Sequence, residues 1–265
     1  MLRRRVASGL VYGLISLSVA YLGGGVLAAA VLLMVTLAGR EYQRMIARAG
    51  YRPLRALQYG LAAFLVIGVA WLSPDVTLAV FVLVFVSSLA WQISRLTEGQ
   101  EPYLEWALTI VGGVYLGWLP AHFILLRASP GGLNWLLLTL AAAWSCDSFA
   151  YLFGRVWGRH PFFPQVSPRK TWEGASAGWI GGTLVVVLGG LVLRLPLLWT
   201  AGLGIVASLA TIFGDLVESL IKRQMGVKDS GGLVPGHGGM LDRVDSLLFT
   251  VVFVYYYVTL VPIAW

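Results

Sequence analysis

The sequence predicts an all-α fold, a polytopic membrane bundle of about nine transmembrane helices. Of the 265 residues, 58% are hydrophobic and 12% are charged, and the mean hydropathy is +0.80. Soluble domains carry roughly 25% charged residues, so this composition excludes a soluble globule. Apolar stretches recur along the whole chain at lengths close to the roughly 20 residues that cross a bilayer. We therefore expect a single integral membrane domain over residues 1–265.

The amino-terminal helices, residues 1–132, are expected to form a scaffold. A glycine triplet at residues 23–25 interrupts the first apolar run, which is too long for one ordinary span, so we divide it there. Three arginines at residues 3–5 precede this run as in a secretory signal, but no small-residue cleavage site follows, so we expect a retained helix. The spans predicted in this half are 6–21, 24–39, 56–72, 77–94 and 103–125.

The carboxyl-terminal helices, residues 133–265, are expected to carry the loops with the most informative residues. The spans predicted there are 133–153, 174–193, 198–221 and 244–263. The sequence shows no fixed-period repeat and no low-complexity linker that would separate domains. Cys146 is the only cysteine, which excludes an intramolecular disulfide and a multi-cysteine metal site. We expect it to be a small buried residue.

The positions of the basic residues predict the orientation in the membrane. With the amino terminus inside, 17 of the 19 Lys and Arg residues fall in the inner gaps, and only Arg127 and Arg194 lie outside. Such an asymmetry is typical of the positive-inside rule. These bases are spread over short loops, so topology explains the net charge of +7 better than nucleic-acid binding does. We expect a protein of the cell (inner) membrane whose amino terminus and polar loops are cytosolic.

Two cytosolic stretches, residues 147–174 and 214–245, contain seven of the 12 acidic residues. Asp215 and Glu218 share one helix face near the inner end of the eighth span. At an effective dielectric near 20, two carboxylates about 5–6 Å apart repel by about 3 kcal/mol, so something must neutralise them. A salt bridge from Glu218 to Lys222 is an equally weighted alternative to a functional role. Asp215 has no such partner on its own helix, which favours a functional role for it.

Asp242 and Asp245 repeat this spacing at the start of the ninth span. Acids in a first turn also favour the helix dipole, and this structural explanation stays open. Two acid pairs on helices joined by one loop nevertheless suit a hard divalent cation such as Mg²⁺, which prefers carboxylates together with substrate phosphates. Asp229, beside Lys228, is a weaker metal candidate because it can pair with a neighbouring base.

Basic residues and glycines surround these acids. Positive-inside flanking explains about half of the bases on its own. Glycines such as Gly231, Gly238 and Gly239, near His237, suit a backbone that turns tightly and offers N–H groups to phosphate oxygens. The combination predicts a site for a polyphosphate and a metal. The bases in question are Lys222, Arg223, Lys228, Arg243, Arg169 and Lys170.

The second stretch resembles the signature of the CTP-dependent phosphatidate cytidylyltransferases, also called CDP-diacylglycerol synthases. SPRKTWEG at 167–174 and DSFAY at 147–151 are similar to further family elements, so the resemblance covers roughly the carboxyl-terminal half. One departure is Val234, where the family usually has Ile, Leu or Phe. The residues in register are Ser219, Lys222, Arg223, Lys228, Asp229, Gly231, Pro235, His237, Gly238, Gly239, Asp242, Arg243 and Asp245.

The resemblance implies transfer of the cytidylyl group from CTP to phosphatidate, which gives CDP-diacylglycerol and pyrophosphate with the help of Mg²⁺. It also implies a multispanning protein that is usually a homodimer. The acids of the family that match Asp215, Asp242 and Asp245 are associated with a metal centre. We expect Asp147, and also Glu218, as further candidates for a metal, with Asp147 either holding a second cation or fixing Lys170.

We hypothesise an in-line displacement in which a phosphatidate oxygen attacks the α-phosphorus of CTP. His237 is then a donor or orienting group, although a structural role in the loop is equally open. A cation-coupled transporter is the alternative from another class, but the acids cluster at one membrane face and inverted repeats are absent. The bases Lys222, Arg223, Lys228 and Arg243 are expected to hold the triphosphate, Arg169 and Lys170 to meet either phosphate group, and Ser219, Gly238 and Gly239 to complete the substrate site.

Overall fold

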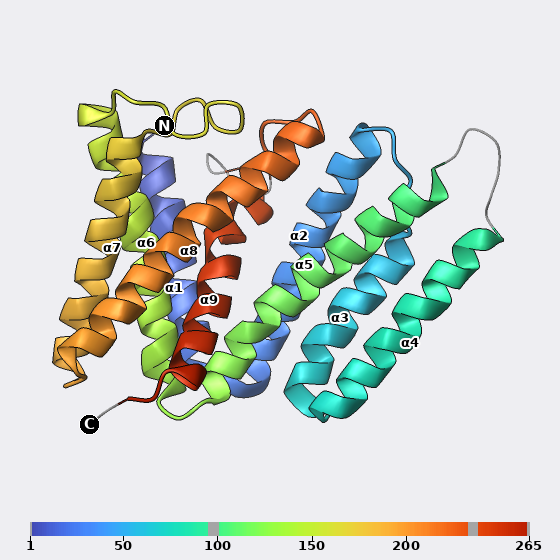
Figure 1. Ribbon diagram of the computed structural model, residues 1–265, viewed down its shortest axis with the longest axis horizontal. Coiled ribbons are helices and arrows are strands. Elements are labelled where there is room, and N and C mark those ends of the chain that lie inside the picture. Colours follow the sequence, from blue (N-terminus) through green and yellow to red (C-terminus); the bar gives the residue numbers. More distant parts are fainter. Residues whose placement is uncertain (1, 95–100, 233–237, 264–265) are drawn as a thin grey trace. The chain divides into compact units, whose positions relative to one another are not determined.

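The computed structural model is helical, as the sequence predicts, and it describes residues 2–94, 101–232 and 238–263, with side chains from residue 9 onwards. An isolated β-bridge joins Pro161 to Thr171. Nine α-helices follow one another in the described part of the chain (Figure 1). They are α1 (Leu2–Leu22), α2 (Gly24–Arg48), α3 (Arg55–Trp71), α4 (Pro74–Ile93), α5 (Pro102–Ala128), α6 (Gly132–Trp157), α7 (Trp172–Val192), α8 (Leu197–Gln224) and α9 (Leu241–Leu260).

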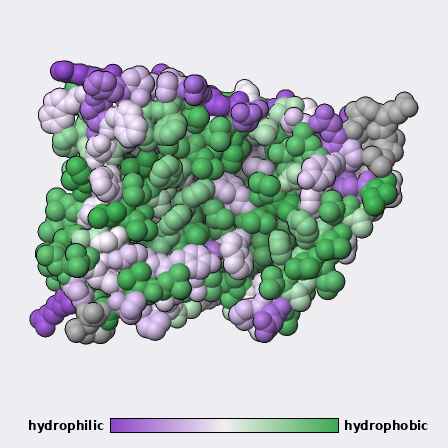
Figure 2. Space-filling model, in the orientation of Figure 1, coloured by the Kyte–Doolittle hydropathy of each residue, from purple (hydrophilic) through white to green (hydrophobic). Residues whose placement is uncertain are grey.

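Seven of these helices are long and apolar enough to cross a membrane, namely α2 and α4 to α9. Large apolar side chains such as Leu78, Leu83 and Ile93 on α4 are exposed. Figure 2 shows hydrophobic residues over much of the visible helix surface. Because water disfavours such a surface and lipid does not, the chain is an integral membrane protein.

The second helix corrects one predicted boundary. We expected the span to end at residue 39 and a loop to follow over 40–55, but α2 continues to Arg48. The added turns are amphipathic, since Tyr42, Met45 and Ile46 are buried while the arginines at 40, 44 and 48 are exposed. Average hydropathy falls in such a segment although its periodicity still supports a helix.

The chain divides into two compact units. Unit 1 comprises Met1–Leu125 and Met225–Asp242, and unit 2 comprises Leu126–Gln224 and Arg243–Trp265. In unit 1, Leu61, Leu65, Trp106 and Ile110 form a buried cluster between α3 and α5. Gly117 allows close approach here, because a Cβ at that position would lie 2.6 Å from Ala62 Cα. Small residues at helix contacts are typical of membrane bundles.

In unit 2, α6, α7, α8 and α9 pack at similarly small residues. A Cβ at Gly178 would lie 2.7 Å from the carbonyl oxygen of Cys146, which is buried as predicted. Gly214 brings α8 against α9, since a Cβ there would lie 2.9 Å from the carbonyl oxygen of Asp245. The next residue of α8 is Asp215, so this contact places the acids of the two helices beside one another.

Candidate active site

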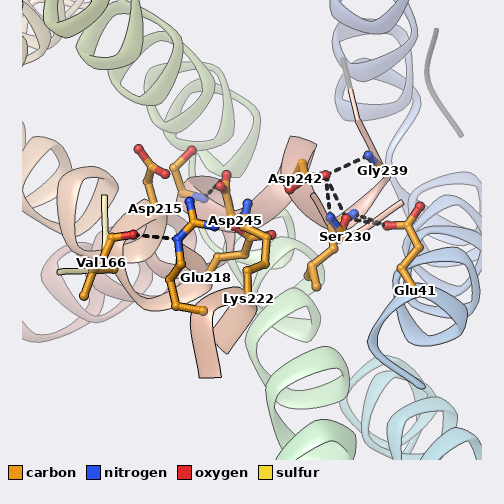
Figure 3. A network of polar contacts seen from close by, with 12 residues as sticks. Glu41, Val166, Asp215, Glu218, Lys222, Ser230, Gly239, Asp242 and Asp245 are labelled. Carbon is orange, nitrogen blue, oxygen red and sulfur yellow. Dashed lines mark hydrogen bonds and ion pairs between the residues drawn. The ribbon is translucent and has the colours of Figure 1, made fainter. Parts of the chain in front are cut away.

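Four acidic side chains of unit 2 gather where α6, α8 and α9 meet, and we call them the carboxylate cluster: Asp147, Asp215, Glu218 and Asp245. The charge of Asp245 interacts with those of the other three, and the charge of Asp147 interacts with that of Asp215. Figure 3 shows Asp215 and Glu218 on α8 next to Asp245. Four carboxylates in so small a volume repel one another strongly and require neighbouring cations.

Two lysines supply part of this neutralisation. Lys170 Nζ lies 2.6 Å from Asp215 Oδ2, and Lys222 pairs with Glu218, four residues before it on α8. Glu218 is fully buried, so the helix salt bridge that the sequence offered for it is present. The partner of Asp215 comes from the loop before α7 rather than from its own helix.

The other two acids of the cluster are linked through Ser246 on α9. Its hydroxyl donates to Asp147 Oδ2 over 3.3 Å, and its backbone N–H donates to Asp245 Oδ1 over 2.6 Å. The charge of Asp147 also interacts with those of Lys170 and Arg243. Lys170 forms its ion pair with Asp215. The predicted contact in which Asp147 fixes Lys170 is therefore only a longer-range charge interaction.

The carboxylate oxygens are suitable ligands for a hard divalent cation. In the described ranges, however, no three Asp, Glu, His or Cys side chains are already arranged to hold a metal ion. Lys170 and Lys222 occupy the positions next to Asp215 and Glu218 instead. The cluster therefore combines anionic oxygen ligands with ammonium groups that can exchange between a carboxylate and a bound phosphate.

The loop between α6 and α7 is folded back so that Lys170 reaches α8. Phe162 N–H donates to the carbonyl oxygen of Lys170 over 2.7 Å. Glu173, in the first turn of α7, accepts from His160 N–H and from its ring Nδ1, over 3.2 Å and 2.5 Å. Arg223, expected to hold phosphate, donates from Nε to the carbonyl oxygen of Val166 over 3.1 Å and so ties the loop to α8.

The remaining predicted residues of unit 2 differ in their accessibility. Arg169 is exposed beside Lys170, whereas Ser219 is buried near the carboxyl end of α8. Arg243 is half-buried near the start of α9. An exposed guanidinium is available to an incoming anion, so of these three Arg169 has the most open position.

Removing Lys222 is expected to destabilise unit 2. Lys222→Met deletes the ammonium group that neutralises the buried Glu218 carboxylate, and loss of one partner from such a pair costs about 3–5 kcal/mol. Lys222→Met combined with Glu218→Gln should recover most of that loss, because the buried charge is then gone. Unfolding in detergent followed by circular dichroism measures both. Equal stability of the single and double variants would contradict the ion-pair explanation.

In unit 1, Asp242 organises the glycine-rich segment, which we define as residues 228–232 and 238–242. Its Oδ2 accepts from Ser230 N–H over 3.1 Å, from Ser230 Oγ over 2.8 Å and from Gly239 N–H over 2.8 Å (Figure 3). Asp242 lies in the first turn of α9, as the helix-dipole alternative supposes, but these three donors precede the helix. The Gly239 N–H, expected to face a phosphate, is used by Asp242 here.

The other predicted residues of this segment differ in backbone conformation and in exposure. Gly238 has φ +80°, a left-handed conformation that favours glycine. Lys228 and Asp229 are both exposed. His237 lies outside the described residues.

Sequence reasoning missed Glu41. This α2 residue is only 4% exposed, and its carboxylate accepts from Met240 N–H over 2.9 Å and from Leu241 N–H over 2.8 Å. Because residues 40–55 were expected to form a basic cytosolic loop, the prediction placed no buried acid at position 41. The available signal was the amphipathic periodicity of that stretch, which places residue 41 on the buried face together with Tyr42 and Met45.

Comparison with known proteins assigns the family. The family model described as "Cytidylyltransferase family" matches residues 3–261. A phosphatidate cytidylyltransferase of Synechocystis is 33% identical over 97% of this chain and 96% of that protein. Chloroplastic phosphatidate cytidylyltransferase 5 of Arabidopsis thaliana is 33% identical over 97% of this chain and 72% of that protein. The phosphatidate cytidylyltransferase of Mycobacterium bovis is 31% identical over 98% and 89% of the two chains.

These matches extend the resemblance found in the carboxyl-terminal half to the amino-terminal helices as well. With a family model covering nearly the whole sequence and relatives above 30% identity, the chain belongs to the cytidylyltransferase family.

Proposed function

We propose that this protein transfers the cytidylyl group of CTP to phosphatidate and releases CDP-diacylglycerol and pyrophosphate. The observation that carries the proposal is the family match over residues 3–261, joined by relatives named phosphatidate cytidylyltransferase. The carboxylate cluster with its paired lysines supports the same reaction, because it offers groups of both signs to a metal and to phosphates. Nothing in the comparisons supports a cation-coupled transporter.

The chemistry is a displacement at phosphorus. A phosphate oxygen of phosphatidate forms a bond to the α-phosphorus of CTP while the bond to the bridging oxygen of the β-phosphate breaks. Phosphate monoesters are already largely ionised near neutral pH, so no strong general base is needed. Lys170, beside Asp215, is placed to exchange its carboxylate partner for a substrate phosphate and to orient it.

Mg²⁺ is the proposed cofactor. Asp215 and Asp245 supply hard anionic oxygens from α8 and α9, and this donor set fits that ion. When bound, the ion screens the negative charge on the α-phosphate and on the leaving pyrophosphate. The metal roles of all five acids, with Asp242, Asp147 and Glu218 as the further candidates, stay predictions. Asp242 and Asp245 accept close hydrogen bonds, and Asp215 and Glu218 have lysine partners that a cation would replace.

The proposal includes how the protein sits in the cell. Seven helices meet the length and hydropathy of a span, and we propose that α1 and α3 complete about nine spans. The asymmetry of the basic residues supports a cytosolic amino terminus and cytosolic polar loops in the inner membrane. Burial of acyl chains, at about 0.8 kcal/mol per methylene, keeps phosphatidate in the leaflet, so the enzyme must meet it there. A homodimer is the proposed assembly.

The activity is tested with the purified protein in detergent, labelled CTP, phosphatidate and Mg²⁺. We expect CDP-diacylglycerol and pyrophosphate in equal amounts. Omission of phosphatidate should abolish both products. No CDP-diacylglycerol, with ion-driven substrate flux into liposomes instead, would favour the transporter.

Metal removal is expected to stop the reaction. An excess of a chelator such as EDTA should reduce product formation to background, because the carboxylate cluster and the phosphates then repel one another without a divalent cation. Added Mg²⁺ in excess of the chelator should restore the rate. Unchanged turnover in chelator would remove Mg²⁺ from the proposal.

A further inference from the structure

The carboxylate of Glu41 contacts both ends of the glycine-rich segment in unit 1. Its Oε2 accepts from Ser230 Oγ over 3.0 Å (Figure 3). Its two oxygens also accept from the backbone N–H groups of Met240 and Leu241. Nearly 200 positions separate Glu41 from these donors in the sequence. One buried acid on α2 therefore connects the start of α9 to the beginning of the segment.

The hydrogen bonds at α9 use donors that the helix itself leaves open. The first N–H groups of a helix have no acceptor within it, and the helix dipole favours negative charge near them. A buried carboxylate that accepts several such bonds is held strongly in one place. Glu41 therefore fixes the position at which the glycine-rich segment enters α9.

Two glycines of the segment make room for this carboxylate. A Cβ at Gly231 would lie 2.7 Å from Glu41 Oε1, and a Cβ at Gly239 would overlap Glu41 Oε2 and Ser230 Oγ. Neither glycine has a positive φ, so their backbone conformation does not require glycine. Space for Glu41 explains both of these glycines without a phosphate.

Ser230 links Glu41 to Asp242. Its hydroxyl oxygen lies 3.0 Å from Glu41 Oε2 and 2.8 Å from Asp242 Oδ2. A hydroxyl has a single proton to donate, so the two carboxylates share this donor. A displacement of Glu41 therefore also changes the hydrogen bonding of Asp242.

We propose that Glu41 is a positioning residue for CTP binding. It touches no substrate, and it acts through the glycine-rich segment by holding that backbone in the conformation that receives the phosphates of CTP. This inference rests on the proposed function, because the segment contains Lys228 and Gly238, which are the residues expected to bind CTP. It also assigns a role in substrate binding to a helix of the amino-terminal half.

Two single variants test this role. Glu41→Gln keeps the shape but turns an amide NH₂ toward N–H and hydroxyl donors, and Gly231→Ala pushes the carboxylate aside. Each is expected to raise the KM for CTP about tenfold, as loss of one charge-assisted contact does, while the KM for phosphatidate changes less than about twofold. Gly60→Ala on α3 is the control, because Gly60 is exposed, lies outside the segment, and a Cβ there meets nothing within 4 Å.

A double variant separates room for Glu41 from room for a phosphate. In a Glu41→Ala background the carboxylate is gone, so adding Gly231→Ala should raise the KM for CTP no further. An equal rise in both backgrounds would overturn the inference, because Gly231 would then be needed for something other than Glu41. If the Glu41 variants do not fold, Gly231→Ala against Gly60→Ala still decides by the KM values.

Hydrogen–deuterium exchange supplies a readout that does not depend on turnover. Exchange at Met240 and Leu241 should accelerate about tenfold or more in Glu41→Gln and Gly231→Ala, and it should stay unchanged in Gly60→Ala. Accelerated exchange with an unchanged KM for CTP would reduce Glu41 to a purely structural residue and contradict the proposal. Absence of CDP-diacylglycerol formation in the unmodified protein would instead sink the proposed function, while the exchange result would stand by itself.

Discussion

Replacing Asp215 or Asp245 by asparagine is expected to lower the rate of CDP-diacylglycerol formation about 1,000-fold, because a bound metal contributes several kcal/mol and each ~1.4 kcal/mol is tenfold in rate. Asparagine keeps the shape of each side chain but removes the anionic oxygen. The two acids lie on α8 and α9, where their charges interact. Loss of either should therefore weaken the metal site without removing a helix contact.

The measurement is the initial rate at saturating CTP and phosphatidate, with circular dichroism to confirm that the helices remain. Asp75→Asn is a suitable control, since Asp75 is exposed in the first turn of α4. Near-normal rates in both Asp215→Asn and Asp245→Asn would remove these residues from the metal site. A loss in only one would assign the metal to that helix.

Replacing Lys170 by methionine is expected to lower kcat/KM about 10- to 100-fold, the range that corresponds to one lost hydrogen bond to a charged group. Lys170 lies 2.6 Å from Asp215 and is the one ammonium group that the α6–α7 loop brings to the carboxylate cluster in the described residues. The same ammonium group competes with a cation for Asp215. The variant should therefore need less Mg²⁺ for half-maximal rate.

Opposite changes in rate and Mg²⁺ requirement distinguish this role from simple loss of structure. Titration of Mg²⁺ at fixed substrate concentration gives both values. Arg159→Met serves as the control, because Arg159 is exposed in the same loop and it is the backbone N–H of Arg159 that donates to Glu173. A higher Mg²⁺ requirement in Lys170→Met would contradict the competition between lysine and metal.

Much of the fold was predictable because continuous apolar runs in a sequence indicate membrane helices. A helix of the described residues covers each predicted span, and seven of these helices are long and apolar enough to cross a membrane. The starts of α8 and α9 lie within a few positions of expectation. The exception was the carboxyl end of α2, where the turns are amphipathic instead of apolar. Mean hydropathy is averaged over all faces of a helix, so it does not detect a helix with one polar face.

The site was predictable where it depends on spacing within one helix. The positions of Asp215, Glu218 and Lys222 on α8 follow from helix periodicity, as does the Glu218–Lys222 pair. The Lys170–Asp215 pair depends on how a loop folds back, which no local pattern encodes. Glu41 was missed for the same reason, since its partners are nearly 200 residues away and only tertiary packing brings them together.

We propose that acids from neighbouring helices together hold the divalent cation used in the reaction. Binding of Mn²⁺ in place of Mg²⁺, followed by electron paramagnetic resonance on the detergent-solubilised protein, tests it most directly. We expect bound Mn²⁺ in the unmodified protein and strongly weakened binding in both Asp215→Asn and Asp245→Asn. Undiminished Mn²⁺ binding in the double variant Asp215→Asn/Asp245→Asn would contradict it.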